Sequence, residues 1–330
     1  MSHSSSHPPH TYPSGAVVVL EPGADADDWH AIRATGLGGS DMAAICGLNP
    51  YTSALEIWLS KVGRPVPRRQ DPVLDEAALM GHALEPIIAT RFTAITGLLA
   101  AEGPGTLRHP SWPWIANLDR VTEENGQPGV VELKSRSSYA LKDWLDEPPV
   151  DVQVQVQHYL AVTGWQYGYV AALIGGQRTI VHRLERDEEM IADLAAIADE
   201  FWGWVENQQQ PPVDGSHATG QLLDRLHAHP DHEVVVADAL TVEWLLEQRA
   251  KAKEQIATGE IALQEIDNQL KNLAGDATDV HIRGELAYSW RPQRGQVSWK
   301  TAALAADPDL DPEPYRGEPT RVLRIHMENQ

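Results

Sequence analysis

The segment NLDRVTEENGQPGVVELKS, residues 117–135, places the strongest constraint on the fold of this chain. Asp119 is followed by a turn-rich segment and then by the short apolar run of residues 130–134, VVELK. The run predicts a buried strand, and the Asn-Gly and Pro-Gly pairs before it indicate a hairpin connection. Because side chains alternate along a strand, Glu132 and Lys134 are expected to share one face.

This pattern has a chemical interpretation and a purely structural one. If Asp119 closes the neighbouring strand, two carboxylates and an ammonium group converge at one edge of the sheet. Paired carboxylates with an open edge suit a hard cation such as Mg²⁺ or Mn²⁺, and the lysine can orient a water or stabilise charge developing on a phosphate. The alternative is a surface hairpin that carries an ordinary Glu/Lys pair. The rest of the chain has to decide between them.

Composition excludes several classes of protein. With Cys46 as its single cysteine, the chain of 330 residues has no disulfide framework, no cysteine-rich zinc site and no iron–sulfur cluster. No apolar run is long enough to span a bilayer, and the polar residues 1–22 predict a disordered tail rather than a signal peptide. We therefore expect a cytoplasmic protein that does not interact with membranes. The net charge of −21 argues against tight non-specific coating of DNA, yet it permits a narrow, focused DNA channel.

A glycine-rich loop, GLGGSD, lies in residues 36–41. Ser40 and Asp41 are candidate N-caps for a helix that follows, and a helix N-terminus attracts anions. Arg33, just before the loop, would add a charged fork for phosphate. The loop matches no nucleotide-binding fingerprint, so no nucleotide cofactor is expected. Interpreted structurally, it is only a flexible turn.

Two predicted helices contribute further candidate residues. Residues 74–97 show helical periodicity, and Glu85 lies among their apolar positions, either facing a metal edge or facing solvent. The segment beginning at Val150 alternates like a strand, but its spacing and its glycine stop favour a helix. On that helix, Gln155 and Tyr159 share a face.

The order of elements predicts a mixed α/β core with an appendage. Strands and helices alternate through residues 23–210, and a polar segment rich in proline and glycine at residues 211–238 predicts a linker. Residues 239–330 then predict a long helix or a helical hairpin, followed by a small β-rich segment. A coiled-coil arm is one form that this helix could take.

The order of these motifs resembles a known family. WHAIR, GLGGSD, GHALEP, NLDR, VELKS and QVQHYLAVTG follow one another as in the YqaJ-type viral recombinases. These are phage nucleases similar to lambda exonuclease, within the PD-(D/E)xK superfamily. The resemblance covers residues 29–205 and extends more weakly into the C-terminal segment. It implies a restriction-endonuclease-like core, in which a mixed central sheet is flanked by helices.

The resemblance also implies metal-binding roles for particular residues. Asp119 and Glu132 would hold one or two Mg²⁺ (or Mn²⁺) ions, helped by Glu85 and by the backbone carbonyl of Leu133. Lys134 would position or activate the attacking water.

Further roles follow for the residues around that centre. Gln155 and Tyr159 match the family's Gln-xxx-Tyr element, which supports the active-site edge. Arg33 and Ser40 match positions that bind a terminal 5′-phosphate. Arg136, in the basic patch after the VELK strand, is predicted to contact DNA.

The implied activity is 5′→3′ exonuclease action on double-stranded DNA ends, which would leave 3′ single-stranded overhangs for a single-strand annealing protein in phage recombination. The resemblance also implies a ring-shaped homotrimer. Two alternatives stay open at this point. One is a structure-selective or nicking endonuclease that uses the same site, and the other is a non-catalytic module that binds DNA ends or a partner.

Overall fold

The computed structural model describes residues 12–64, 66–67, 69, 71–229, 234–307 and 310–316. The chain divides into two compact units, residues 1–227 and 228–330. Both hydrophobic clusters are built from residues of the first unit alone. The two units are therefore described separately.

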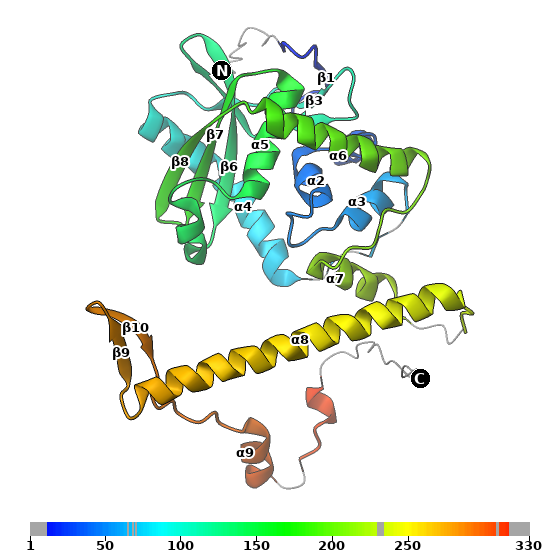
Figure 1. Ribbon diagram of the computed structural model, residues 1–330. Helices are drawn as coiled ribbons and strands as arrows, with labels where there is room; N and C mark the ends of the chain where they lie inside the picture. The colour runs from blue at the N-terminus through cyan, green and yellow to red at the C-terminus, as the bar shows by residue number, and fades with distance from the viewer. Residues whose placement is uncertain are drawn as a thin grey trace. The chain divides into compact units, whose positions relative to one another are not determined.

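A mixed sheet forms the centre of the first unit, as the resemblance implies, and it has five strands (Figure 1). Its strands, in spatial order, are β2 (Ala101–Glu102), β5 (Arg120–Glu124), β6 (Gln127–Arg136), β7 (Tyr167–Ile174) and β8 (Arg178–Glu185). β6 pairs with β5 in antiparallel orientation and with β7 in parallel orientation, and β7 and β8 form an antiparallel hairpin.

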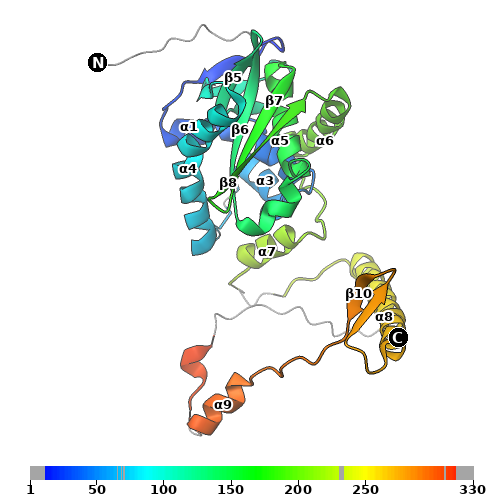
Figure 2. The ribbon, with the colours of Figure 1, turned by 90° about the vertical axis from the view of Figure 1, so that its left-hand side faces the viewer.

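Helices cover both faces of this sheet. α4 (Pro72–Thr96) packs on one face, where Ile88 and Phe92 join Val131 and Leu133 in a cluster. The opposite face meets α5 (Val150–Thr163), which follows a short 3₁₀ helix, η1 (Ser138–Trp144). Figure 2 shows the sheet between α4 and the α5–α6 side. The central mixed sheet flanked by helices confirms the predicted fold class of the core.

The β5–β6 hairpin forms where the sequence indicates, but only one of its two predicted turn pairs makes the turn. Asn125 and Gly126 adopt φ values of +54° and +75°, as a tight hairpin turn requires. Residues 128–129, Pro-Gly, lie inside β6. Gly129 is needed there because the aromatic ring of Tyr167 occupies the space that a Cβ would fill. This glycine therefore serves close packing rather than a turn.

The N-terminal segment is ordered from Tyr12 onward, which corrects part of the predicted disordered tail. The Tyr12 ring stacks on Trp165 at 5.7 Å, and Ser14 Oγ donates to the Val162 carbonyl at 2.5 Å. β1 (Val17–Leu20) then joins β3 (Thr106–Arg108) and β4 (Ile115–Asn117) in a small antiparallel sheet. Contacts that lie far apart in sequence hold this segment, and composition cannot reveal them. Residues 1–11 of the predicted tail lie outside the described residues.

Helices complete the first unit around the small sheet and the α5 side. They are α1 (Ala26–Ala34), α2 (Gly39–Ile45), α3 (Ala54–Lys61), α6 (Glu188–Glu206) and α7 (His217–Leu226). α7 lies within residues 211–238, for which the sequence predicts a linker. It buries Ala218 and Leu222, and Arg225 Nη2 donates to Glu56 Oε1 of α3 at 2.7 Å. In the sequence, the short apolar stripe of α7 is difficult to recognise because the residues around it are polar and rich in proline.

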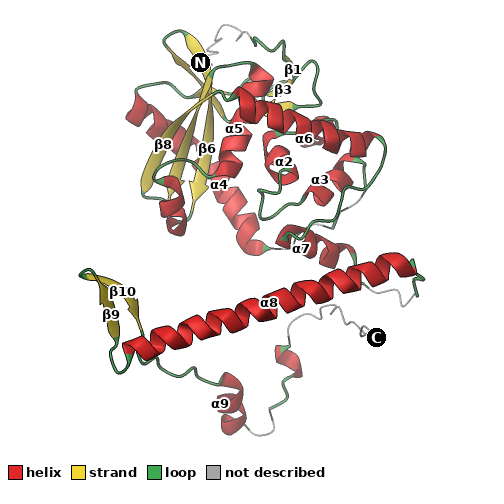
Figure 3. Ribbon diagram, in the orientation of Figure 1, coloured by secondary structure: helices red, strands yellow, loops and turns green. Residues whose placement is uncertain are grey.

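The second unit centres on the predicted long helix, α8 (Ala239–Ala274), followed by a hairpin of β9 (Asp279–Ile282) and β10 (Glu285–Ser289) (Figure 3). Residues 299–306, expected in a β-rich segment, instead form α9 (Trp299–Ala306). The Ser298 side chain caps it by accepting from Thr301 N.

A short 3₁₀ helix, η2 (Glu313–Tyr315), follows α9. Residues 320–327, which also belong to the segment expected to be β-rich, lie outside the described residues. Across the described part of the chain, no helix is both long enough and apolar enough to cross a membrane.

Candidate active site

The candidate site lies where β6 extends beyond its neighbour β5. The β5–β6 ladder ends at the pair Arg120–Val131, so residues 132–136 pair only with β7. On the open side, the Leu133 N–H donates to Asp119 Oδ2 at 2.8 Å. The edge predicted from the sequence is therefore the unpaired half of a central strand. Asp119, just before β5, covers it.

The predicted face of β6 carries a connected polar chain. Lys134 Nζ donates both to Glu132 Oε1 and to Gln155 Oε1 of α5, the latter at 2.9 Å. Gln155 Nε2 in turn donates to the Tyr159 hydroxyl at 2.8 Å. The strand period thus brings Glu132 and Lys134 together, and one helical turn brings Gln155 and Tyr159 together.

The two buried carboxyl groups of the site, Asp119 and Glu132, lack full hydrogen-bonding and electrostatic compensation from the described residues. Glu132 is 2% exposed, and its Oε2 atom accepts no hydrogen bond from any residue that the structure describes. Burial raises the pKa of Asp119 well above its ordinary value, and the neighbouring charge of Glu132 raises it further. An orphaned carboxylate oxygen beside a second buried acid fits a divalent cation, because such a cation favours both charged forms.

The Leu133 carbonyl, predicted from the resemblance as a metal ligand, faces this same open side. In a strand, the N–H and C=O of one residue point in the same direction. Because the Leu133 N–H points at Asp119, its carbonyl lies on the Asp119 side of β6 as well.

Glu85 stands apart from the other two carboxylates. It lies on α4 with its side chain 27% exposed, and its Oε1 pairs with His82 Nδ1 at 2.9 Å. Its charge still contributes to the raised pKa of Asp119, as the smallest of the causes. Among the described residues, no three His, Cys, Asp or Glu side chains converge closely enough to enclose a metal ion. The structure therefore brings together Asp119 and Glu132, with Glu85 within electrostatic reach.

The glycine loop touches the polar chain directly. A Cβ on Gly39 would lie 2.8 Å from Gln155 Cγ and 2.9 Å from Tyr159 Cε1, closer than real side chains pack. Only glycine lets the first turn of α2 approach α5 this closely. The loop predicted to bind an anion and the residues that hold Lys134 are thus in contact.

Beneath the loop, Arg33 is paired with a buried acid. Arg33 Nη2 donates to Asp41 Oδ1 at 2.6 Å, and Lys61 Nζ donates to Asp41 Oδ2 at 2.9 Å. Burial raises the pKa of Asp41, but attraction by Arg33 and Lys61 and the Gly38 N–H bond outweigh it, so that its pKa is lowered overall. Asp41 is the third residue of α2 and Gly38 is the N-cap, which corrects the predicted Ser40/Asp41 cap.

A hollow of about 510 Å³ opens beside this pair, lined by Arg33, Asp41, Lys61, Trp29 and Arg69 among others. The Arg33 guanidinium also lies over the Trp29 ring, at 5.6 Å from its centroid. Ser40 is exposed on the first turn of α2, and it does not line the hollow. The predicted phosphate-binding pair therefore comprises one residue in the hollow and one on the open surface.

Arg136 lies at the end of β6, two residues beyond Lys134. Its guanidinium stands over the Trp144 ring at 5.9 Å, and Nη1 donates to the Ser135 carbonyl at 3.0 Å. It is thus anchored beside η1 and is not joined to the Arg33 group.

Comparison with known proteins assigns the chain to a family. Residues 28–166 match the model of the YqaJ-like viral recombinase domain. An uncharacterized YqaJ protein of Bacillus subtilis is 36% identical over 272 residues, which cover 81% of this chain and 83% of that protein. The chain belongs to the YqaJ-like viral recombinase family. The YqaJ-like chain also shares a short segment with an African swine fever virus protein, 59% identical over 36 residues, or 11% of this chain and 10% of that one.

Solved structures similar to this YqaJ-like chain include two exonucleases. An alkaline exonuclease from Laribacter hongkongensis is 21% identical, covers 56% of this chain and 94% of its own, and has a TM-score of 0.46. A phage-related exonuclease from Haemophilus somnus is 11% identical, covers 55% and 99% respectively, and has a TM-score of 0.38.

The roles of two residues of the YqaJ-like site do not follow from the sequence. The sequence indicates Asp41 only as a helix cap, and it indicates no role for Lys61. The available signal for Asp41 was its place directly after Gly-Gly-Ser at a helix start. Lys61 lies twenty residues further along at the end of α3, so no local spacing relates it to Asp41.

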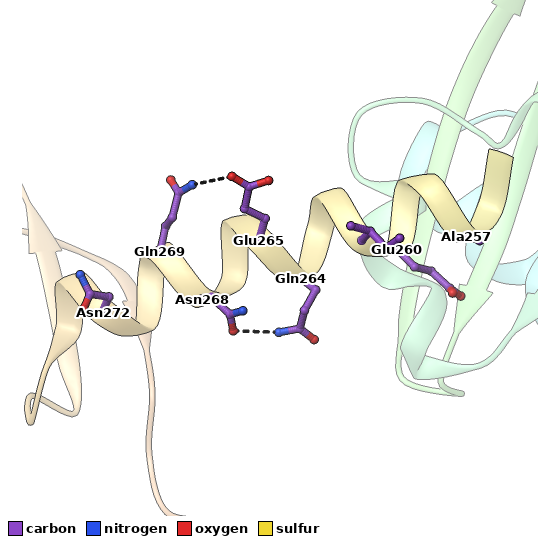
Figure 4. Close-up of a pocket in the computed structure, with 8 residues that line it drawn as sticks. Ala257, Glu260, Gln264, Glu265, Asn268, Gln269 and Asn272 are labelled. Carbon is purple, nitrogen blue, oxygen red and sulfur yellow. Dashed lines mark hydrogen bonds between the residues drawn. The ribbon is translucent and has the colours of Figure 1, made fainter. Parts of the chain in front are cut away.

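A second hollow lies along α8 in the second unit of the YqaJ-like chain, with a volume of about 840 Å³ (Figure 4). Its lining is mostly carboxamide and carboxylate, with Gln264 Nε2 donating to Asn268 Oδ1 at 2.9 Å. It contains no lysine or arginine beside a carboxylate. It therefore lacks the groups from which the site on β6 is built.

Proposed function

We propose that the chain is a Mg²⁺-dependent exonuclease that degrades double-stranded DNA from 5′ to 3′. One observation carries the proposal. The Lys134 ammonium is held between Glu132 and Gln155, beside the buried Asp119, on the open half of β6. A binding module has no need of an ammonium held in place beside two buried, incompletely compensated carboxylates.

The donor set around Asp119 is suited to hard cations. Asp119 and Glu132, with the Leu133 carbonyl and Glu85, would hold one or two Mg²⁺ or Mn²⁺ ions. When bound, a divalent metal lowers the pKa of an attacking water and offsets charge on the leaving oxygen. The orphaned Glu132 Oε2 is an oxygen that such an ion would satisfy.

The remaining groups position the reaction. Lys134 orients the attacking water and stabilises charge on the phosphate oxygens. Gln155 fixes the Lys134 ammonium through its carbonyl oxygen, and Tyr159 fixes the Gln155 amide. Because Tyr159 and Gln155 are packed against Gly39, the ammonium is held by a rigid support rather than by a flexible chain end.

The glycine loop supports the direction of digestion. Arg33, in the hollow, and Ser40, on the first turn of α2, would receive a 5′-terminal phosphate, and Arg136 would contact the DNA beyond the cleaved bond.

Membership of a viral recombinase family supports a role in recombination, in which the 3′ overhang passes to a single-strand annealing protein. We extend the proposal to a homotrimeric ring, which would encircle the DNA and keep the enzyme bound to it. A net charge of −21 favours a narrow channel over broad DNA coating.

The decisive experiment compares end-labelled linear duplex with closed circular DNA in the presence and absence of Mg²⁺. We expect linear DNA to be degraded only with Mg²⁺ and circles to be spared. Digestion of circles at the rate of linear DNA would instead establish an endonuclease. Binding of ends without any cleavage would establish a non-catalytic module.

Two substitutions test the site itself. Lys134→Ala and Asp119→Ala should each lower the cleavage rate on the order of hundredfold or more, because the first removes the ammonium that stabilises charge on the phosphate and the second removes a ligand of the metal. Lys253→Ala, at an exposed lysine of α8, is the matched control and should cleave normally. Circular dichroism shows whether each variant is folded. Retained activity in Asp119→Ala would overturn the site assignment.

A further inference from the structure

A buried cluster of one acid and two cations lies under the glycine loop. The side chains of Asp41 and Lys61 are 5% and 4% exposed, and that of Arg33 is 21% exposed and reaches the hollow. Each Asp41 oxygen accepts from a different cation, and Oδ2 also accepts from Gly38 N at 3.0 Å. Both carboxylate oxygens of Asp41 therefore have hydrogen-bond partners inside the protein.

The charges of this cluster do not cancel. Arg33 paired with Asp41 alone would be a neutral ion pair, and a neutral pair attracts phosphate weakly. Lys61 contributes a second positive charge, so the cluster is net positive by one. A terminal phosphate monoester carries between one and two negative charges near pH 7, so this surplus decides how strongly the pocket prefers it.

The other charged groups of the hollow are engaged elsewhere. Glu56 accepts from Arg225 of α7 at 2.7 Å, and Arg69 donates to Gln221 and to the Tyr51 carbonyl. Because both of these partners are neutral, Arg69 adds a positive charge of its own to the hollow; within the cluster of Arg33, Asp41 and Lys61, the surplus charge originates from Lys61.

Lys61 also holds the backbone that carries Arg33. Its Nζ donates to the Arg33 carbonyl at 2.7 Å, at the C-terminal end of α1. A lysine at that end satisfies a carbonyl that the helix leaves free and interacts favourably with the helix dipole. The same ammonium thus links the last residue of α3, Asp41 in α2 and the end of α1.

We propose that Lys61 is a specificity-determining residue for phosphorylated 5′ ends. It compensates Asp41, so that Asp41 can orient the Arg33 guanidinium while the pocket keeps a net positive charge. The inference rests on the proposed 5′-end pocket, and it adds to that pocket a residue that need not touch the DNA.

The test measures binding without cleavage. The affinity of the full chain for a hairpin duplex ending in a 5′-phosphate or a 5′-hydroxyl is measured by fluorescence anisotropy in EDTA, which prevents metal-dependent cleavage. We expect the wild-type protein to prefer the phosphorylated end by about tenfold, the effect of one charge-assisted hydrogen bond. No preference in the wild-type protein would overturn the proposed pocket itself, whatever Lys61 does.

Two variants then separate charge from structure. Lys61→Met keeps most of the side-chain volume and should bring the preference close to one. Lys61→Met combined with Asp41→Asn restores a net charge of plus one and should recover the preference to within about threefold. Lys253→Met, at an exposed lysine of the second unit, is the matched control.

A salt series adds a readout that a structural role would not change. The slope of log Kd against log salt for phosphorylated ends should fall by about one unit, the value of one phosphate contact, in Lys61→Met. It should return to the wild-type value in the double variant. Undiminished preference in Lys61→Met, or a folded double variant that does not recover it, would overturn the inference while the proposed pocket stands. If Lys61→Met alone fails to fold, Lys61→Gln, which is also uncharged but keeps a hydrogen-bond donor for the Arg33 carbonyl, takes its place in both measurements.

Discussion

At the scale of single residues, Asp41 shows how a buried acid can remain ionised. It is 3% exposed, and burial by itself raises the pKa of a carboxyl group. Arg33, Lys61 and the Gly38 N–H reverse that effect, so its pKa lies below the ordinary 3.8. Asp119 shows the opposite outcome, because burial raises its pKa most and the charge of Glu132 beside it raises the pKa further.

The lowered pKa of Asp41 predicts an acid-dependent loss of stability. A carboxyl group whose folded pKa is depressed contributes stability above its unfolded pKa, and that contribution is lost as the pH falls through the folded pKa. The difference in free energy of unfolding between wild type and Asp41→Asn should therefore be constant near pH 6 and shrink below about pH 3.8. Urea unfolding at a series of pH values measures it. Asp276→Asn, at an exposed aspartate, serves as the control, and a difference for Asp41→Asn that stays constant down to low pH would contradict the prediction.

At the scale of secondary-structure elements, the contact of α2 with α5 is the decisive one. α2 begins at Gly39, whose missing side chain leaves room for Gln155 and Tyr159 of α5. Through Gln155 the contact extends to Lys134 on β6. A short helix, a core helix and the central strand thus share one tightly packed junction.

Gly39→Ala should disturb this junction selectively. The added Cβ must displace Gln155 and Tyr159, and misplacement of a catalytic group by about 1 Å costs up to about a hundredfold in rate. We expect cleavage to slow between about tenfold and a hundredfold while affinity for DNA ends changes less than about threefold. Single-turnover kinetics and binding in EDTA measure the two quantities.

The matched control for that experiment is Gly203→Ala, in α6, where an added Cβ meets no atom within 4 Å. It should leave both quantities unchanged, and alanine should slightly favour its helix. Equal slowing in both variants would show that the junction has no special role.

At the scale of the whole molecule, the two units differ in how they bury apolar surface. Both hydrophobic clusters consist of first-unit residues. In the second unit, α8 leaves apolar side chains such as Ile256, Leu263 and Ile266 more than half exposed. Its stability as a helix therefore rests on local interactions more than on a core.

Removal of residues 230–330 should therefore leave the first unit folded. We expect the melting temperature of the main unfolding transition to change by no more than about 2 °C, because the clusters that stabilise it are intact. Differential scanning calorimetry of the full and shortened chains provides the comparison. A fall of ten degrees or more would show that the second unit contributes to that core.

The sequence by itself determined which residues share a face within one element. The period of two brought Glu132 and Lys134 together, the helical period paired Gln155 with Tyr159, and the mixed α/β core followed from the order of elements. These relations are local, since backbone geometry repeats over a few residues.

The tertiary structure alone decided which elements meet. It placed Lys61 against Asp41, Gly39 against Tyr159, and Asp119 against the half of β6 that β5 leaves unpaired. It also ordered residues 12–22 and folded α7, both assigned to irregular segments from composition. Such contacts depend on how side chains of distant segments fill a common volume, and no periodicity within a segment encodes that packing.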